Sequence, residues 1–381
     1  MRIPFNFPYV PEASFEHLGK VLTSGHLSGS GAYSRLAEGM LANITSEQPH
    51  LLTTSCSHAL ELAVRALEIG PGDEVIIPSF NFTSAANAIV LAGARPVFVD
   101  VDSKTQCLDV DRVAHAITPN TKAVIVVHYG GVAYKLRELV EVCKKNNVYL
   151  IEDNAHGLGG VYSGQMLGTF GDLSTYSFHE TKNIHSGEGG SISFKDLKIK
   201  EKLEILREKG TDRSKFSRGL VDKYSWQDAG SSWVQSDILA AFLVSQLEEF
   251  KSIQASRHYI WSKYHEGLRE WAEENNYSLM DPLQNPGHTA HLFFIIFESA
   301  RQQADYISYM SKNGVGTPFH YQALHESKAG LRFGRSSGGF ENTQRAASRL
   351  VRLPLWPGMT DNQVMNVIEL TKNFSKNEPH S

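Results

Sequence analysis

The 381-residue sequence contains few cysteines, and they are scattered. Cys56, Cys107 and Cys143 are its three cysteines, and no two of them form a Cys-x-x-Cys pair. This pattern is typical neither of a disulfide-rich secreted protein nor of a structural zinc site. The sequence therefore predicts a reducing, cytoplasmic location and no metal site.

Long apolar runs and a surplus of positive charge are also lacking. No stretch approaches the roughly 18 consecutive apolar residues of a membrane helix. The first residues, Met-Arg-Ile-Pro-Phe-Asn, do not form a charged region followed by an apolar leader. The 37 Lys and Arg against 41 Asp and Glu give a net charge of -4. We therefore expect no membrane insertion and no nucleic-acid partner.

The dinucleotide-binding fingerprint Gly-x-Gly-x-x-Gly is absent as well. Gly29-x-Gly31 has neither the third glycine nor a preceding strand. A nicotinamide-dependent dehydrogenase is therefore not indicated. Because the chain also lacks a basic surface, an anionic ligand must be bound by a few local groups.

Short apolar strands alternate with amphipathic helices between residues 55 and 194, a pattern typical of a doubly wound, mostly parallel α/β sheet. The expected strands are 74–77, 96–101, 123–128, 148–152, 173–177 and 191–194. The expected helices of this part are 57–67, 84–92 and 135–146.

The second half of the chain is predicted to be more helical. Residues 236–271 fit either one long helix or two helices joined by a bend. Further expected elements are strands 291–297 and 316–319 and helices 301–313 and 360–374. We therefore predict a large domain over residues 1–250, which includes the N-terminal segment, and a smaller α+β domain over residues 251–381.

The most informative functional signal is a lysine in a loop between two expected strands. Residues 177–183, Ser-Phe-His-Glu-Thr-Lys-Asn, lead into the glycine-rich residues 187–190 and place Lys182 between the strands. A lysine there can be desolvated enough to act as an amine in Schiff-base chemistry with pyridoxal 5'-phosphate (PLP). A single loop lysine is more often a surface residue, so this interpretation depends on the neighbouring motifs.

Acidic residues follow the strand at residues 148–152. The sequence there reads Glu152-Asp153-Asn154-Ala155-His156, at the strand end where open α/β sheets bind ligands. Asp153 can pair with the protonated pyridine nitrogen of PLP and keep the ring an electron sink. His156 can hydrogen-bond the ring oxygen, although a single histidine is more often a structural residue.

Two further motifs fit the phosphate and the ring of the same cofactor. Residues 53–58, Thr-Thr-Ser-Cys-Ser-His, precede an expected helix whose positive end would attract a phosphate. An ordinary helix cap is the alternative. Phe82, or Phe80 two residues earlier, follows the strand at 74–77 and can stack on a pyridine ring. A buried core position is equally open for either ring.

In combination these motifs resemble the PLP-dependent nucleotide-sugar aminotransferases of fold type I. The resemblance extends from residues 24–29, Ser-Gly-His-Leu-Ser-Gly, to residues 353–355, Leu-Pro-Leu. It implies that Lys182 binds the cofactor covalently, that Asp153 binds its ring nitrogen and that Phe82 stacks on it. It further implies that His156 lies near the ring oxygen and that the phosphate is bound by Cys56, Ser57, His58 and Ser177.

The resemblance also implies a homodimer with shared active sites. Family members donate a polar residue, commonly Asn, to the partner's site, and that position here is Ser232; the arginine that often follows is Val234. His320 and Tyr321, in a segment that lacks the family's proline, are the expected substrate contacts. Two basic residues, Arg213 and Lys223, are candidates for binding glutamate or a diphosphate, with a solvated surface role as the alternative.

A closer resemblance is carried by residues 207–232. Arg-Glu-Lys-Gly-Thr at 207–211, Trp226 and Gly-Ser-Ser at 230–232 are similar to dTDP-4-amino-4,6-dideoxygalactose transaminases. These enzymes move the amino group of L-glutamate to C-4 of dTDP-4-keto-6-deoxyglucose. Amination at C-3, another nucleotide sugar, or a PLP-binding regulator without activity remain open. A related sugar dehydratase has histidine in place of the lysine, so Lys182 argues against that reaction.

Overall fold

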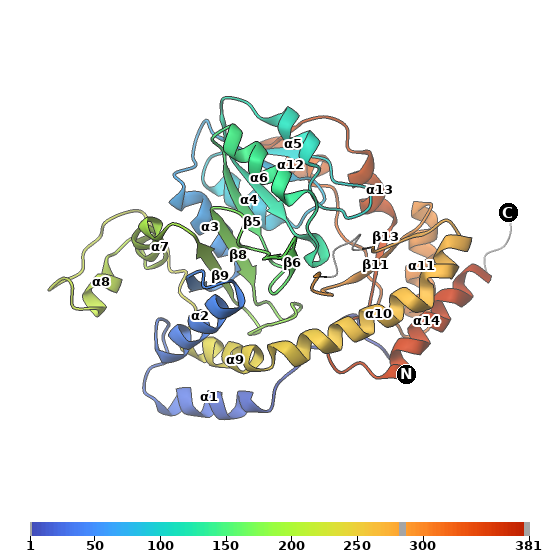
Figure 1. Ribbon diagram of the computed structural model, residues 1–381, viewed down its shortest axis with the longest axis horizontal. Helices are drawn as coiled ribbons and strands as arrows, with labels where there is room; N and C mark the ends of the chain where they lie inside the picture. The colour runs from blue at the N-terminus through green and yellow to red at the C-terminus, as the bar shows by residue number, and fades with distance from the viewer. Residues whose placement is uncertain (1, 282–286, 377–381) are drawn as a thin grey trace.

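A twisted eight-stranded sheet forms the centre of the computed structural model, which describes residues 2–281 and 287–376 (Figure 1). The strands from β8 to β12 run parallel, whereas at the other edge β9 runs antiparallel to both of its neighbours, β8 and β1. The predicted α/β class with a mostly parallel sheet is confirmed. In spatial order the strands are β1 (His50–Thr53), β9 (Gly190–Phe194), β8 (Leu173–Ser177), β5 (Tyr149–Asp153), β4 (Thr121–Val127), β2 (Glu74–Pro78), β3 (Arg95–Val99) and β12 (Arg335–Ser336).

Helices cover both faces of this sheet. Val75 and Ile77 of β2 pack with residues of α3 (Cys56–Ala66) and α4 (Thr83–Leu91), while Ile76 packs on the opposite side. That opposite side is covered by α5 (Val110–Ala116) and α6 (Leu136–Lys145). Burial on both faces explains why the inner strands are continuously apolar in sequence.

The remaining helices surround the sheet or belong to the C-terminal part. Figure 1 shows α1, α2 and α9 together beneath one end of the sheet, and α10 extending from there towards α14. Their bounds are α1 (Ala13–Thr23), α2 (Ala32–Ile44), α7 (Lys200–Arg207), α8 (Arg213–Ser217), α9 (Asp237–Glu248), α10 (Phe250–Glu274), α11 (Ala300–Lys312), α12 (Lys328–Phe333), α13 (Glu341–Arg349) and α14 (Asp361–Lys376), with short 3₁₀ turns η1 (Tyr129–Gly131), η2 (Leu197–Ile199) and η3 (Leu324–Glu326).

The C-terminal part has a small antiparallel sheet of its own. It consists of β10 (Ser278–Leu279), β11 (Phe293–Ile296) and β13 (Leu350–Leu353). Side chains of α10, α11 and α14 cover it in one apolar cluster, which Ile3 joins from the other end of the chain. A two-domain division near residue 250 stays a prediction, and residues 282–286 and 377–381 of the second predicted domain lie outside the described residues.

Residues 316–319 and 236–271 differ in part from what the sequence predicts. The predicted strand at 316–319 is wrong: Phe319 makes only an isolated bridge to Val351, since Pro318 has no N–H to donate to a ladder. The stretch 236–271 is two helices, because Glu249 between α9 and α10 leaves the helical conformation. The sequence reading also missed β1 and β13, which are short, and the helices α1, α2 and α5. None of the described helices is long and apolar enough to cross a membrane.

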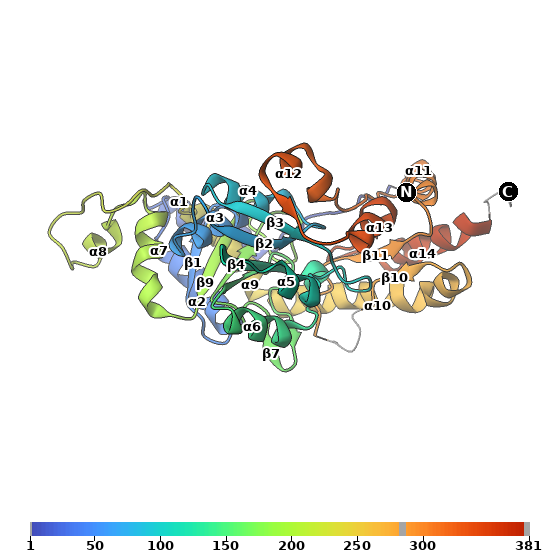
Figure 2. The same ribbon diagram turned by 90° about the horizontal axis from the view of Figure 1, so that it is seen from above.

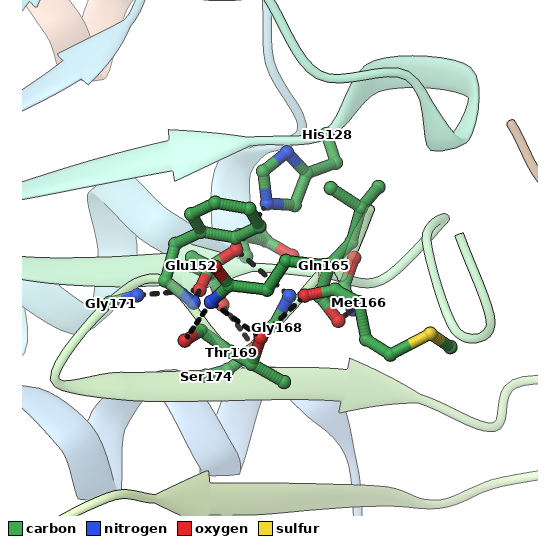
Figure 3. A network of polar contacts seen from close by, with 12 residues as sticks. His128, Glu152, Gln165, Met166, Gly168, Thr169, Gly171 and Ser174 are labelled. Atoms are coloured by element: carbon green, nitrogen blue, oxygen red, sulfur yellow. Dashed lines mark hydrogen bonds and ion pairs between the residues drawn. The ribbon is translucent and has the colours of Figure 1, made fainter. Parts of the chain in front are cut away.

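A buried carboxylate fixes the chain around the end of β5. Side chains alternate along a strand, so Glu152 points to the opposite side from Asp153. Glu152 accepts hydrogen bonds from the backbone N–H groups of Gly168 (2.8 Å), Phe170 (2.7 Å) and Gly171 (2.7 Å). Figure 3 shows Glu152 with Gly168 and Gly171. The fourth partner of Glu152 is His128, directly after β4, whose Nε2 lies 2.7 Å from Glu152 Oε2. These bonds tie β4, β5 and the chain after the β6–β7 hairpin (Val161–Tyr162, Gln165–Met166) together.

Replacing Glu152 with Gln should destabilise the fold. Burial favours the protonated carboxyl, but the bonds from His128 and the backbone outweigh it and lower the pKa of Glu152 below the ordinary 4.5. A glutamine amide cannot accept all four bonds, and we expect a loss of about 3 kcal/mol or more in unfolding free energy. The stabilisation should be complete above about pH 4.5 and disappear as the pH falls through the lowered pKa.

Urea unfolding of wild-type and Glu152→Gln protein at pH 7 and at stepwise lower pH measures this difference. Glu141→Gln, an exposed change on α6, is the control and should alter stability by less than about 0.5 kcal/mol. Equal stability of Glu152→Gln and wild type at pH 7 would show that the network does not hold the strand ends.

Candidate active site

A cavity of about 590 Å³ lies at the carboxyl ends of β5 and β8. Since these strands are parallel neighbours, their ends meet at one edge of the sheet. The cavity brings together most residues of the predicted site, although they come from five separate stretches of sequence. Those that line it are Cys56, Ser57, Phe82, Asp153, His156, Ser177, Lys182, His320 and Tyr321.

Lys182 is held in a tight loop between β8 and β9. The loop is closed by backbone hydrogen bonds from Phe178 N–H to Gly189 O (2.8 Å) and from Glu180 N–H to Gly187 O (2.9 Å). Burial in the cavity wall lowers the pKa of Lys182 to about 8, against the opposing effects of Cys56 and Asp153. Its Nζ has no hydrogen-bond partner among the described residues. Near neutral pH the free amine of Lys182 is therefore more accessible than that of an exposed lysine.

Asp153 is a buried carboxylate at the end of β5, with few partners of its own. Its Oδ1 accepts the backbone N–H of Ala155 at 3.2 Å and lies 4.0 Å from Cys56 Sγ. Burial raises the pKa of Asp153, while the Ala155 bond and the charges of Lys182 and His128 oppose that shift. Within the described residues, no basic side chain forms an ion pair with it. A cationic ring nitrogen would supply the missing partner.

His156 lies beside the same cavity as a neutral imidazole. Its Nδ1 accepts the backbone N–H of Gly130 at 3.2 Å, and its ring stacks on His291 with the centroids 4.1 Å apart. Burial lowers the pKa of His156 well below 6.5. Because Nδ1 is an acceptor, the proton of the neutral ring is on Nε2, which is then a hydrogen-bond donor.

Two helix N-termini converge on the phosphate end proposed from the sequence. Ser57 in the first turn of α3 is hydrogen-bonded to Ser84 in the first turn of α4, with the hydroxyls 2.6 Å apart, and both residues line the cavity. β9 packs tightly against this end of α3, since a Cβ on Gly190 would lie 2.4 Å from the carbonyl carbon of Ser55. The arrangement presents hydroxyls and two positive helix ends to an anion.

His58 is not part of that arrangement. Its side chain bonds Thr54 Oγ1 at 2.5 Å and stacks near Trp233, and it does not line the cavity. Its backbone N–H is already taken by Ser55 Oγ, the N-cap of α3. These contacts place the side chain of His58 behind the helix end, and its expected role in binding phosphate stays a prediction.

The structure separates Phe82, the ring expected to stack on the cofactor, from its alternative Phe80. Phe80 is 1% exposed and packs on Tyr129 in the C-terminal cluster, whereas Phe82 is 58% exposed and lines the cavity. Strand alternation does not relate the two rings, because β2 ends at Pro78. Phe82 therefore has a ring surface available to a ligand.

Three predicted residues do not approach the cavity of their own chain. Ser232 bridges to Glu208, and both Arg213 and Lys223 are exposed. They belong to the segment of residues 208–232, whose helix α8 projects from the body of the molecule in Figure 2. The substrate-binding role expected for Arg213 and Lys223 is therefore not available within one chain.

The cavity also contains residues that sequence motifs did not reveal. Arg257 of α10, Arg352 of β13 and the N-terminal residues Phe5 and Asn6 line its C-terminal side. There His320 lies against Tyr321, with ring centroids 3.5 Å apart, and its Nδ1 is 3.1 Å from the Tyr129 hydroxyl. No local pattern marks these positions, because tertiary folding alone brings them to the site.

The residues present fit PLP. Asp153 lacks a cationic partner, Lys182 has an unpaired amine, and the N-termini of α3 and α4 form an anion site in the same cavity. Asp153 would pair with the ring nitrogen of PLP, and Phe82 would stack on the face of the ring. Ser57 and Ser177 would bind the phosphate. No group of three or more metal-binding side chains is found among the residues that the structure describes.

Comparison with known proteins agrees with this geometry. The sequence model of the DegT/DnrJ/EryC1/StrS aminotransferase family matches residues 8–372. The spore coat polysaccharide biosynthesis protein SpsC of Bacillus subtilis is 29% identical over 385 residues, which cover 98% of this chain and 97% of SpsC.

Two solved structures have the same fold over almost the whole chain. The aminotransferase TlmJ of Streptoalloteichus hindustanus is 29% identical, with a TM-score of 0.90 and 99% of each chain covered. Spr1654 of Streptococcus pneumoniae, in its PLP form, is 27% identical, also with a TM-score of 0.90 and 99% of each chain covered. Spr1654 bears a provisional assignment as a sugar aminotransferase and has also been solved in a PMP form.

Asp153→Asn should keep the fold and bind the cofactor but slow its reaction with an amino acid. The amide keeps the size of the side chain and removes the charge that stabilises a protonated ring nitrogen. We expect at least about a hundredfold slower conversion to the amine form of the cofactor, measured by stopped-flow absorbance. His156→Asn, the comparison variant, should lose less, because the contact expected of His156 is with the ring oxygen and not with the ring nitrogen. Conversion by Asp153→Asn at nearly the wild-type rate would mean that Asp153 is not the ring partner.

Proposed function

We propose that the acceptor of this enzyme is a nucleotide-linked 4-keto-6-deoxy sugar. The chain belongs to the DegT/DnrJ/EryC1/StrS aminotransferase family and is a PLP-dependent aminotransferase. L-Glutamate is the amino donor, dTDP-4-keto-6-deoxyglucose the acceptor, and a dTDP-4-amino-4,6-dideoxyhexose the product. The observation that carries the transfer chemistry is the buried Lys182, with its lowered pKa, in one cavity with the buried carboxyl group of Asp153.

The residues of the chain divide the work of this reaction. When bound, PLP supplies an electron sink for the charge that develops on the carbon losing a proton. Lys182 Nζ takes that proton from the α carbon of the donor, and delivers a proton to the sugar carbon in the second half-reaction. Asp153 would stabilise the positive charge at the ring nitrogen of the bound cofactor. His156 would donate a hydrogen bond from Nε2 to its ring oxygen. The serines at the starts of α3 and α4 bind the phosphate.

A sugar acceptor is supported by three observations. SpsC acts in polysaccharide biosynthesis by its name, and Spr1654 is provisionally a sugar aminotransferase. A cavity of about 590 Å³ is larger than an amino acid needs and lies within the range of roughly 300–1,000 Å³ for sites of larger ligands. Residues 207–232 resemble the 4-keto sugar transaminases, and this favours C-4 and a dTDP sugar.

The segment 208–232 also supports a homodimer with composite sites. It carries three exposed aromatic side chains, Phe216, Tyr224 and Trp226, of which Trp226 is 78% exposed. Since Ser232, Arg213 and Lys223 do not approach the cavity of their own chain, a partner's cavity is where they would act. Sedimentation should give a dimer, and a fully active monomer would contradict this arrangement.

A cytoplasmic location is part of the proposal and rests on the cysteines. Cys107 and Cys143 are buried free thiols, and Cys56 is a free thiol of the cavity. Disulfide bonds would form in an oxidising compartment, whereas free thiols are usual where glutathione keeps them reduced. Labelling with a thiol reagent in intact and lysed cells, with a fusion that reports the compartment, tests this point.

The donor and acceptor can be identified together. Purified protein loaded with PLP is incubated with L-glutamate and a panel of dTDP-, UDP- and GDP-linked 4-keto and 3-keto sugars, and the products are identified by NMR. We expect amination at C-4 of dTDP-4-keto-6-deoxyglucose and formation of 2-oxoglutarate. The Lys182→Ala protein, as control, should retain cofactor through the phosphate and ring contacts yet form no product.

Each alternative predicts a different result from that panel. Amination at C-3, or a clear preference for a UDP or GDP sugar, would replace the proposed acceptor while keeping the transfer chemistry. A PLP-binding regulator would convert no sugar with any amino acid, and that outcome would contradict the proposed function as a whole.

A further inference from the structure

The cavity contains a cation that no acidic side chain neutralises. Arg352 of β13 lines the cavity together with Lys182, and it forms no ion pair within residues 2–281 and 287–376. Its Nη2 donates to the carbonyl of Phe319 at 3.0 Å, and its guanidinium carbon lies 4.4 Å from the ring centroid of Phe5. A largely buried positive charge without an anion is unfavourable, so a ligand anion would complete its environment.

The guanidinium of Arg352 has unused hydrogen-bond donors. Nε is buried without a partner, and Nη1 has no partner among the described residues. Arg257 differs, because its Nε and Nη2 already donate to the backbone carbonyls of Ala290 and His291. Arg257 therefore fixes the chain beside His156, while Arg352 has donors left for a ligand. A guanidinium with unused donors can bind a carboxylate through its planar fork.

We propose that Arg352 binds the α-carboxylate of the amino donor and that Phe5 positions its guanidinium. Among the anionic groups of the two substrates, the α-carboxylate is the one bonded to the carbon that carries the reacting nitrogen. It must therefore lie close to Lys182, as Arg352 does. The diphosphate of a nucleotide sugar is separated from the reacting carbon by the sugar ring and would lie farther from Lys182.

The charge of Arg352 also affects the other ionisable side chains of the cavity wall, as expected if it lies beside the reacting carbon. The positive charge of Arg352 helps to lower the pKa values of Lys182, His156 and His320, after the larger effect of burial on each. These three side chains surround the place where the reacting carbon would lie. The inference rests on the proposed function, because it assigns a subsite for the donor of that reaction.

The experiment compares three donors that differ in one carboxylate. L-Glutamate has both groups, L-isoglutamine has an amide at the α position, and L-glutamine has an amide at the γ position. Single-turnover conversion of PLP-loaded protein is followed by absorbance for wild type and Arg352→Gln. With L-glutamate and L-glutamine the variant should be about 10- to 100-fold less efficient, and with isoglutamine nearly unchanged. The loss should also appear as weaker equilibrium binding of α-methylglutamate, which has no α proton to transfer.

Matched variants separate this role from a loss of structure. Arg349→Gln makes the same charge change at the end of α13, outside the cavity, and should leave both measurements unchanged. Arg352→Lys keeps the charge without the fork and should lose less than Arg352→Gln. Phe5→Leu removes the ring from the guanidinium and should weaken α-methylglutamate binding a few-fold. Thermal unfolding and the cofactor spectrum check that each variant is folded and loaded.

The outcomes distinguish the inference from the function on which it rests. Unchanged conversion of L-glutamate and unchanged α-methylglutamate binding by Arg352→Gln would overturn the inference while the transfer activity stands. Weakened binding of dTDP with normal use of L-glutamate would also overturn it and assign the arginine to the diphosphate. A wild-type protein that takes an amino group from no amino acid would contradict the proposed function and this subsite with it.

Discussion

The burial of Lys182 and Asp153 in one cavity is the constraint on which the rest of the site depends. Two opposite charges removed from water are unfavourable unless each finds partners. Here neither is fully partnered: burial lowers the pKa of Lys182 to about 8 and raises that of Asp153. The sheet holds both groups in this state because they follow parallel neighbouring strands, and the network around Glu152 and His128 fixes the end of β5. A cofactor with an aldehyde and a basic ring nitrogen uses both groups.

The walls of the cavity come from distant parts of the chain. The N-termini of α3 and α4 form the end suited to an anion, and Phe82 lies beside them. The opposite wall belongs to the C-terminal part, where His320, Tyr321 and Arg352 lie next to residues 5–6 of the N-terminal segment. Ile3 joins the C-terminal cluster, and Asn6 donates to the backbone of Glu180 in the lysine loop. The N-terminal segment therefore links the small sheet to the loop of Lys182.

The sequence predicted best what a local pattern determines. Lys182 and Asp153 could be found because each follows a recognisable strand, and a strand end fixes where the next side chains lie. The resemblance favoured Phe82, but the local pattern alone could not separate it from Phe80, since strand alternation ends with β2 at Pro78. The sequence could not place the side chain of His58, because a helix N-cap and a phosphate site have the same residues in sequence. Arg352 and Phe5 carry no motif at all, and only packing places them in the cavity.

The central claim is that Lys182 is the amine that carries the cofactor. The purified protein should be yellow, and borohydride reduction should attach the cofactor permanently to one residue, which peptide mapping can identify. We expect the modified peptide to contain Lys182, and we expect no stable attachment in the Lys182→Ala protein. Attachment of the reduced cofactor to a different lysine in the wild-type protein would contradict the account of this site.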